Sequence, residues 1–305
     1  MGTIKGYKGF NTDLKCRGFQ YEIGKEYTQE GTIECCENGF HFCESPLSVL
    51  GYYRPTDSRY CEVEGSGEID REGDKVAVSH IKIGKEIGLS DLINAAIKFI
   101  HDKIKGGEAL VTHCNDYSAV VNSHDCSAVI NRGDNSIAAN TGFHSIATNT
   151  GIFSVAANTG CYSVATSSGE YSLATNTGSY SASVNAGRHS VAINTGHCSI
   201  VTNTGHCSIV TNFGCRSVAT TIGEDSVATN NGDYSEAKVT GNGSLAIVTG
   251  KGCKAAGEMG CWLVLTERNM YHDITDMKCV KVDGETIKPN TYYMLKGGKI
   301  VEVED

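Results

Sequence analysis

Histidine and cysteine side chains recur in the middle of the chain at a spacing that could bind a metal ion. The segment GHCSIVTNTGHCS places His197 and Cys198 nine residues before His206 and Cys207. Imidazole and thiolate groups are the ligands that zinc prefers, and a closed structural site needs four of them. If the chain here forms coils of eighteen residues, the two His-Cys pairs lie on opposite edges of a coil and cannot share one ion. Only residues eighteen apart would stack, and two stacked ligands do not make a closed site. Because the chain also has no CxxC pair, we expect no metal site.

A second group of residues that could do chemistry lies in the N-terminal third of the chain. The motifs GYKGF, GFHFCESP and CEVE follow one another there, and their order resembles the strand order of ADP-ribosyltransferase folds. In those folds a basic residue and a Ser or Tyr hold NAD, and a Glu assists the transfer. In this sequence Lys stands where that family has Arg, and the hydroxyl motif is degenerate. The resemblance implies as candidates Lys8, His41, Ser45, Glu62 and Glu64.

Other catalytic signatures are absent from the sequence. It contains no Walker loop, no GxSxG elbow and no HExxH helix. His41 and Cys43 also fit an ordinary strand. We therefore expect a protein that is not an enzyme and needs no cofactor, with an NAD-using transferase as the alternative.

Charge and composition narrow the classes of function further. A formal net charge of -9 argues against direct nucleic-acid binding through phosphate neutralisation. An acidic surface could instead mimic nucleic acid and inhibit a host-defence enzyme, although acids such as Glu170 and Asp233 lack a regular phosphate-like spacing. The sequence shows no secretory signal and no membrane-spanning apolar stretch. These features predict a cytoplasmic protein whose 14 Cys are mostly buried and reduced, with association with a virion as the alternative.

A nonapeptide repeat occupies the middle of the chain. Seventeen units with the consensus S-[VIL]-A-[TVIA]-N-T-G-x-x follow one another from Ala109 to Cys261, and the first residue is Ser from Ser118 to Ser244. The S-V-A-T segment predicts a short strand and N-T-G a turn. We expect the turn Gly to adopt a positive φ and the Asn to bond its local backbone. Two units close one coil, so the repeat predicts a flattened parallel β-roll, a β-helix solenoid of about eight and a half coils.

The direction of the strand side chains decides which residues are exposed. Positions one and three of the repeat are always small, whereas positions two and four include Glu236 and Lys238. Because a narrow roll could not bury that pair without partners, we expect Ser and Ala inside and Val, Ile and Thr outside. The reverse arrangement remains an alternative. The outward row would be the interface of a homo-oligomer, either a dimer or a trimer, and it contains Val155, Leu173, Val191, Ile209 and Val227. Aromatic edge stacks are expected at Phe153 with Tyr171 and at Tyr162 with Tyr180.

The repeat resembles two known kinds of β-roll. The SVAxN run is similar to the head repeats of trimeric autotransporter adhesins, which form parallel β-rolls that associate as trimers, although those heads use a different repeat length. The nine-residue period also resembles the calcium-binding rolls of secreted toxins, whose turns carry Gly-Gly-x-Gly-x-Asp. The turn here is Asn-Thr-Gly, without the carboxylate. We therefore expect no calcium.

The segment before the repeat predicts a small domain and a helix. Residues 1–88 alternate like short strands around SPLSVLGYY, which indicates an α+β domain. Its run YKGF…CRGFQYEIGKEY…GFHFCESPL…YY resembles a domain that recurs in phage and prophage proteins of unassigned function. Residues 89–108 predict a helix that caps the open end of the roll, with Ser90 as its N-cap and Gly106 after its end.

Residues 262–305 predict a small β-rich C-terminal cap. Hairpin turns are expected at Asp283-Gly284 and Gly297-Gly298. Trp262, the only Trp, follows the last repeat and is expected to plug the final coil.

Together the sequence predicts a mainly β, non-enzymatic protein of phage or prophage type. We expect its repeat scaffold to oligomerise and to bind a macromolecular partner, either a host protein or a virion component. The pattern identifies neither that partner, nor the handedness of the roll, nor a ligand of the N-terminal domain.

Overall fold

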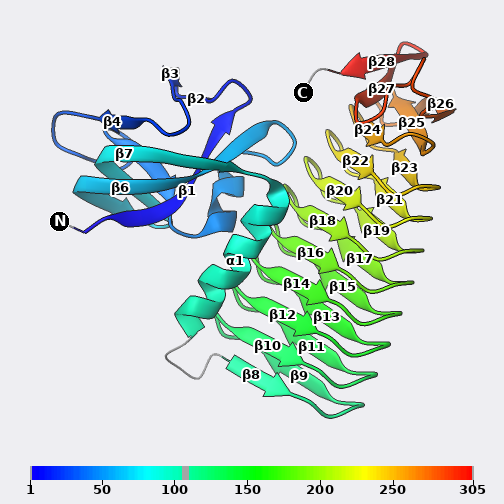
Figure 1. Cartoon of the computed structure of the whole chain (residues 1–305), viewed down its shortest axis with the longest axis horizontal. Coiled ribbons are helices and arrows are strands. Elements are labelled where there is room, and N and C mark those ends of the chain that lie inside the picture. Colours follow the sequence, from blue (N-terminus) through cyan, green and yellow to red (C-terminus); the bar gives the residue numbers. More distant parts are fainter. Residues whose placement is uncertain (1, 105–109, 304–305) are drawn as a thin grey trace. The chain divides into compact units, whose positions relative to one another are not determined.

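The computed structural model describes residues 2–104 and 110–303. It consists of two compact units, Met1–Phe99 and Ile100–Asp305 (Figure 1). Strands make up 48% of the structure and helix 7%, with a parallel β-solenoid of about 9 turns, an N-terminal sheet domain and a small C-terminal strand cap. The predicted fold class is therefore confirmed.

The first unit is built around a five-stranded antiparallel sheet in the order β4-β7-β5-β1-β6. β7 also pairs with β6, so the sheet closes on itself. Aromatic and branched side chains fill its interior, among them Phe10, Phe40, Phe42 and Ile81. The elements are β1 (Ile4–Asn11), β2 (Lys15–Cys16), β3 (Phe19–Gln20), β4 (Glu26–Thr28), β5 (Phe40–Cys43), the 3-10 helix η1 (Pro46–Gly51), β6 (Ser58–Glu72) and β7 (Lys75–Ile87).

The predicted helix is present as α1 (Leu89–Ile104). It begins before Ser90, so Ser90 lies in its first turn rather than at the N-cap, and the Leu92 amide donates to the carbonyl of Gly88. Asp91 also lies in the first turn, where a carboxylate complements the positive end of the helix dipole. Gly106, Ala109 and the remainder of the predicted capping segment 89–108 after residue 104 lie outside the described residues. The capping role stays a prediction.

The roll consists of short parallel strands that alternate between two sheets (Figure 1). Even-numbered strands form an eleven-stranded sheet that ends in β27 and β28, and odd-numbered strands form a ten-stranded sheet that ends in β25 and β26. The strands are β8 (Leu110–His113), β9 (Ala119–Asn122), β10 (Ala128–Asn131), β11 (Ile137–Asn140), β12 (Ile146–Asn149), β13 (Val155–Asn158), β14 (Val164–Ser167), β15 (Leu173–Asn176), β16 (Ala182–Asn185), β17 (Val191–Asn194), β18 (Ile200–Asn203), β19 (Ile209–Asn212), β20 (Val218–Thr221), β21 (Val227–Asn230), β22 (Glu236–Val239), β23 (Leu245–Val248), β24 (Lys254–Gly257), β25 (Trp262–Arg268), β26 (Ile274–Lys281), β27 (Tyr292–Lys296) and β28 (Lys299–Val303).

The pairing register confirms that two nonapeptides form one coil. Val155 pairs with Leu173, and Leu173 with Val191, so equivalent residues stack at intervals of eighteen. Ser at position one and Ala at position three are buried along the roll, for example Ser172 and Ala174. The expectation that Ser and Ala face inwards is therefore correct.

The interior of the roll is held by side chains that bond the backbone of neighbouring coils. Ser190 Oγ accepts from the Ser172 amide at 3.0 Å, and Ser172 Oγ donates to the Gly151 carbonyl at 3.1 Å. Asn149 Nδ2 donates to the Ser136 carbonyl at 3.0 Å, while its Oδ1 accepts from the Gly151 amide at 3.0 Å. These bonds satisfy buried polar groups, which would otherwise be costly to desolvate.

The repeat glycines serve a different purpose from the one predicted. The positive φ lies two residues later, at position nine, where Tyr180 has φ 57. Gly178 is required instead by close approach of the coils, because a Cβ at this position would lie 2.0 Å from the Gly160 carbonyl oxygen. Nearly every repeat glycine meets the glycine eighteen residues before it in the same way. The prediction of a left-handed glycine was therefore wrong.

The last repeat unit has eight residues rather than nine. Leu245 pairs with Trp262, seventeen residues later, because Cys261 takes the place of the repeat Ser. The Cys261 thiol donates to the carbonyl of Gly241 at 3.1 Å, much as a repeat Ser donates to a Gly carbonyl. Trp262 therefore occupies an outward position on β25 and is 43% exposed, so the predicted plug over the final coil was wrong.

The C-terminal cap contains one of the two predicted hairpin turns. β27 and β28 pair across Gly297 and Gly298, which both have positive φ. At Asp283 the chain forms a loop instead, because the Asp283 carboxylate accepts from three following backbone amides. That second hairpin was predicted wrongly.

Replacing Gly178 by Ala should destabilise the roll strongly. The new Cβ would clash with the Gly160 carbonyl, and overpacking of this kind costs about 3 kcal/mol. Urea unfolding followed by far-UV circular dichroism measures the loss. The exposed neighbour Thr177→Ala is the control, with a change within about 0.5 kcal/mol. Equal stability of the two variants would contradict the close-approach argument.

Candidate functional site

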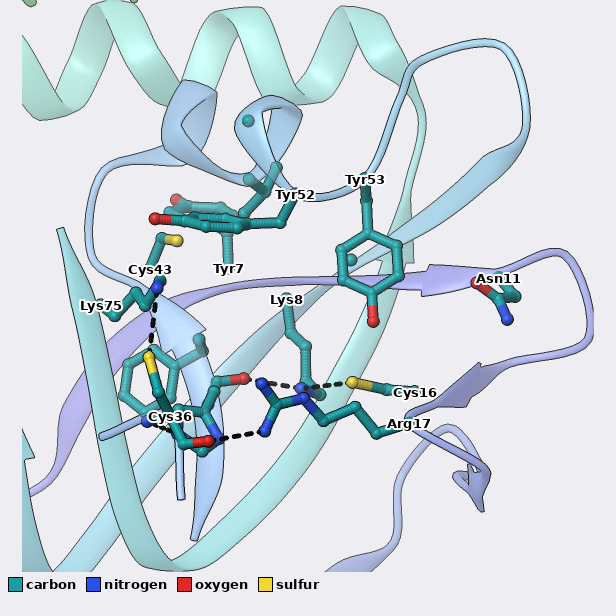
Figure 2. Close-up of a pocket in the computed structure, with 15 residues that line it drawn as sticks. Tyr7, Lys8, Asn11, Cys16, Arg17, Cys36, Cys43, Tyr52, Tyr53 and Lys75 are labelled. Atoms are coloured by element: carbon teal, nitrogen blue, oxygen red, sulfur yellow. Dashed lines mark hydrogen bonds between the residues drawn. The ribbon is translucent and has the colours of Figure 1, made fainter. Parts of the chain in front are cut away.

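A hollow of about 540 Å³ lies in the first unit (Figure 2). Its walls come from β1, β5, the segment around β2, the end of η1 and the start of β7. Gly9 in β1 leaves room for Tyr53 in one wall of the hollow, because a Cβ at Gly9 would lie 2.5 Å from Tyr53 Cβ. The glycine thus lets the Tyr53 ring pack against β1. The motif KGYKGF therefore forms strand β1 and also contributes to one wall of the hollow.

Lys8 is the most deeply buried charged residue of this site, with 3% of its surface exposed. Its Nζ donates to the His41 carbonyl oxygen at 2.6 Å and to Cys16 Sγ at 3.5 Å. The same Nζ lies 5.5 Å from the Phe10 ring centroid and 5.3 Å from that of Tyr21. Burial lowers the pKa of Lys8, because removal from water disfavours the charged ammonium.

Two further cations meet at the backbone and thiol of Cys36 (Figure 2). Arg17 Nη1 donates to the Cys36 carbonyl at 3.0 Å, and Lys75 Nζ donates to Cys36 Sγ at 3.3 Å. The Cys36 amide donates to His41 Nε2 at 2.8 Å, so this nitrogen acts as an acceptor. The pKa of His41 is lowered, first by burial and then by the positive charges of Lys8, Arg17 and Lys75.

The charge of the hollow is one-sided. Lys8, Arg17 and Lys75 line the hollow, and none of the described residues that line it is Asp or Glu. The hydrogen bond to Cys36 raises the pKa of Lys75, and the charges of Glu72 and Asp74 raise it further. The Cys36 thiol also donates to Glu72 Oε2 at 3.4 Å. A cationic hollow in a chain of net charge -9 is suited to an anionic ligand.

The structure brings together two of the residues that the transferase resemblance implies. Lys8 and His41 both line the hollow, but Ser45, Glu62 and Glu64 do not. Glu62 is exposed on β6 opposite Tyr7, and Glu64 lies 3.7 Å from Lys5 Nζ. The catalytic roles of these residues stay predictions.

Sequence reasoning missed most of the cationic wall. Arg17, Cys36, Lys75, Tyr52 and Tyr53 were not selected as site residues. They come from four separate segments of the chain, and the β5–β7 pairing places the start of β7 beside the hollow. The paired tyrosines after η1 were the one local signal, since two adjacent aromatic residues follow a glycine there.

The outer face of the ten-stranded sheet forms a second candidate site, which we call the uncharged face. It is formed by positions two and four of the odd-numbered strands β9–β25, and none of these side chains is charged. Ile209 is 46% exposed, and Val155, Leu173, Val191 and Val227 are each partly exposed. The face contains Ala119, Val121, Ile137, Ala139, Val155, Ala157, Leu173, Thr175, Val191, Ile193, Ile209, Thr211, Val227, Thr229, Leu245, Ile247, Trp262 and Val264.

Aromatic rings stack along the edges of the roll. The Phe153 and Tyr171 ring centroids lie 5.0 Å apart, and those of Tyr162 and Tyr180 lie 5.1 Å apart. The His189 ring stacks on the Tyr171 ring and so extends the stack of Phe153 and Tyr171. Among the described residues, no three or more His, Cys, Asp or Glu side chains are placed to share a metal ion.

The neutral state of His41 can be tested by titration. Because its folded pKa lies below the ordinary value of 6.5, the unfolded chain binds more protons near that pH. Folding stability should therefore fall as the pH drops below 6.5. Nuclear magnetic resonance of histidine-labelled protein measures the pKa, with His41→Gln to assign the signal. Titration at or above 6.5 would contradict the burial described here.

Comparison with known proteins identifies only the first unit. A family model described as a domain of unknown function (DUF7666) matches residues 4–95, which is less than half of the chain. No curated protein and no solved structure matches. Within the described residues no helix is long and apolar enough to cross a membrane. The first unit is thus similar to a domain to which no activity has been assigned.

Proposed function

We propose that this chain is a non-enzymatic scaffold protein of phage or prophage type. Its roll associates with further copies of the chain through the uncharged face, and the resulting oligomer binds another macromolecule, either a host protein or a virion component. The observation that carries the proposal is the absence of charge from the uncharged face over the described strands β9–β25.

The two sheets differ in charge at the last coils of the roll, β22 and β24, which favours the ten-stranded sheet as the interface. The outer side of the eleven-stranded sheet carries Glu236, Lys238 and Lys254, and Lys254 Nζ forms an ion pair of 3.0 Å with Glu236 Oε1. The uncharged face has only aliphatic side chains, threonines and Trp262 at equivalent positions. Exposed apolar patches of this extent mark interaction surfaces on proteins in water.

A second copy of the same chain is the occupant that fits this face best. At about 4.8 Å per strand the nine strands of the face extend over about 40 Å. A flat face without charges offers little to select an unlike partner by electrostatic complementarity. A symmetry axis would bring the same patch of two copies together, so that one uncharged face covers the other.

The assignment to phage or prophage rests on the resemblance of residues 1–88 to a domain recurring in such proteins. The similarity of the repeat to trimeric adhesin heads likewise supports association through the roll, as a dimer or a trimer. We place the protein in the cytoplasm of the host bacterium or on the virion, because both locations present macromolecular partners to a rigid scaffold.

The geometry supports the two alternative functions less well. A transferase would need a glutamate beside the NAD site, and Glu62 and Glu64 do not line the hollow. A nucleic-acid mimic would need acids directed at its target. Two of the turn acids bond the roll instead, since Asp134 and Asp233 accept from the amides of Ile152 and Lys251.

Charging the uncharged face should dissociate the oligomer without unfolding the roll. The double variant Val191→Lys with Ile209→Lys places two ammonium groups on adjacent strands. Light scattering after size-exclusion chromatography should show a monomer, with an unchanged far-UV circular dichroism spectrum.

The matched control adds the same charges eighteen residues apart in the turns. The variant Thr177→Lys with Thr195→Lys alters exposed positions outside the uncharged face and should keep the oligomer. An unchanged oligomer in the first variant would contradict the proposed interface. Loss of its β signal would contradict the outward direction of these side chains.

A further inference from the structure

We propose that the hollow of the first unit binds a phosphate-bearing small molecule. Its anionic group would contact Arg17 and Lys75 and be attracted by the buried ammonium of Lys8, while its remaining part would lie against the tyrosine wall. This inference goes beyond the proposed scaffold function and does not depend on association of the roll.

The first argument is the excess of positive charge at the site, which Glu72 and Asp74 offset only at Lys75. Within the described part of the chain, no ion pair joins Lys8, Arg17 or Lys75 to a carboxylate. Glu37 lines an adjoining hollow of about 190 Å³ with Lys8 and Arg17, but it forms an ion pair with neither. Several cations that share a small volume repel one another, so an anion between them lowers the electrostatic energy.

The second argument is the environment of Lys8. Its partners are a carbonyl, a thiol and two aromatic rings, and none of them carries a full negative charge. A buried ammonium without a counter-charge is costly. The sequence nevertheless places this lysine where 3% of it is exposed, on the wall of a hollow large enough for a ligand. A bound anion would supply the missing charge.

The third argument concerns the kind of anion. A guanidinium beside an ammonium group is a favourable arrangement for phosphate, whose oxygens accept several charge-assisted hydrogen bonds. A phosphate monoester also carries close to two negative charges at neutral pH, which suits three neighbouring cations better than one carboxylate does.

The fourth argument is the size and lining of the hollow. Its volume of about 540 Å³ lies within the range of pockets that take small molecules, and it exceeds what a phosphate ion alone would fill. Tyr7, Tyr52 and Tyr53 line it, and the Tyr52 residue is 48% exposed. Lys75 Nζ lies 5.0 Å from the centroid of that ring. Aromatic surface beside a cation suits a planar ring that carries a phosphate, as in a nucleotide.

Calorimetric titration of the full chain with three probes tests the proposal. We expect adenosine monophosphate to bind with a dissociation constant of about 1 mM or lower, and adenosine at least about tenfold more weakly, because it lacks the charge. Inorganic phosphate identifies the source of the ligand. Weaker binding of phosphate than of the nucleotide would support a phosphate ester whose remaining part lies against the tyrosine wall. Equal binding of free phosphate would overturn the contact with that wall. No binding of either phosphate probe, or equal binding of adenosine, would overturn the proposal.

Two variants and a control connect binding to the hollow. Arg17→Gln and Lys75→Gln should each raise the dissociation constant of the bound phosphate probe by about tenfold or more. This is the loss expected for a charge-assisted contact. Arg54→Gln changes an exposed arginine of the same unit that does not line the hollow, and should leave affinity within about twofold. Unchanged affinity in both site variants, with normal circular dichroism spectra, would overturn the assignment to this hollow.

Discussion

Hydrogen bonds from buried serine hydroxyls to the backbone of neighbouring coils are the interaction on which the roll depends. Each coil closes after eighteen residues, so that Ser172 Oγ accepts from the Ser154 amide of the preceding stacked strand and donates to the Gly151 carbonyl. Removing such a hydroxyl would leave a buried backbone group unsatisfied, at a cost of about 1–3 kcal/mol. The bonds also require that stacked turns approach closely, which is why the residue opposite the carbonyl must be glycine.

This narrow polar interior determines what the surface of the roll contains. With Ser, Ala and Asn filling the inside, the β-branched residues that favour strands must point outwards. A conventional sandwich buries such residues in its own core. This roll leaves them partly exposed on the ten-stranded sheet, whereas Ile146, Val164 and Ile200 of the eleven-stranded sheet are buried. The charged outer positions of the eleven-stranded sheet gather at its end near the cap, and the ten-stranded sheet has none at the corresponding positions. The fold thus leaves an uncharged, partly exposed surface on the ten-stranded sheet.

The periodic features of the fold could be predicted from sequence, and features that depend on long-range pairing could not. The coil length and the inward Ser and Ala follow from which positions stay small over many units. The role of Gly178 and the eight-residue last unit before Trp262 depend on how coils stack, which a repeat consensus does not contain. Of the hollow, sequence motifs indicated Lys8 and His41. Arg17 and Lys75 were missed because loops and strand pairing bring them there from distant segments.

Sedimentation equilibrium of the unmodified chain over a range of micromolar concentrations tests the central claim most directly. The account predicts a species of at least twice the 32.5 kDa of one chain, because we propose that another copy covers the uncharged face. A single species of 32.5 kDa at every concentration would contradict the account, since the apolar face would then remain in contact with water.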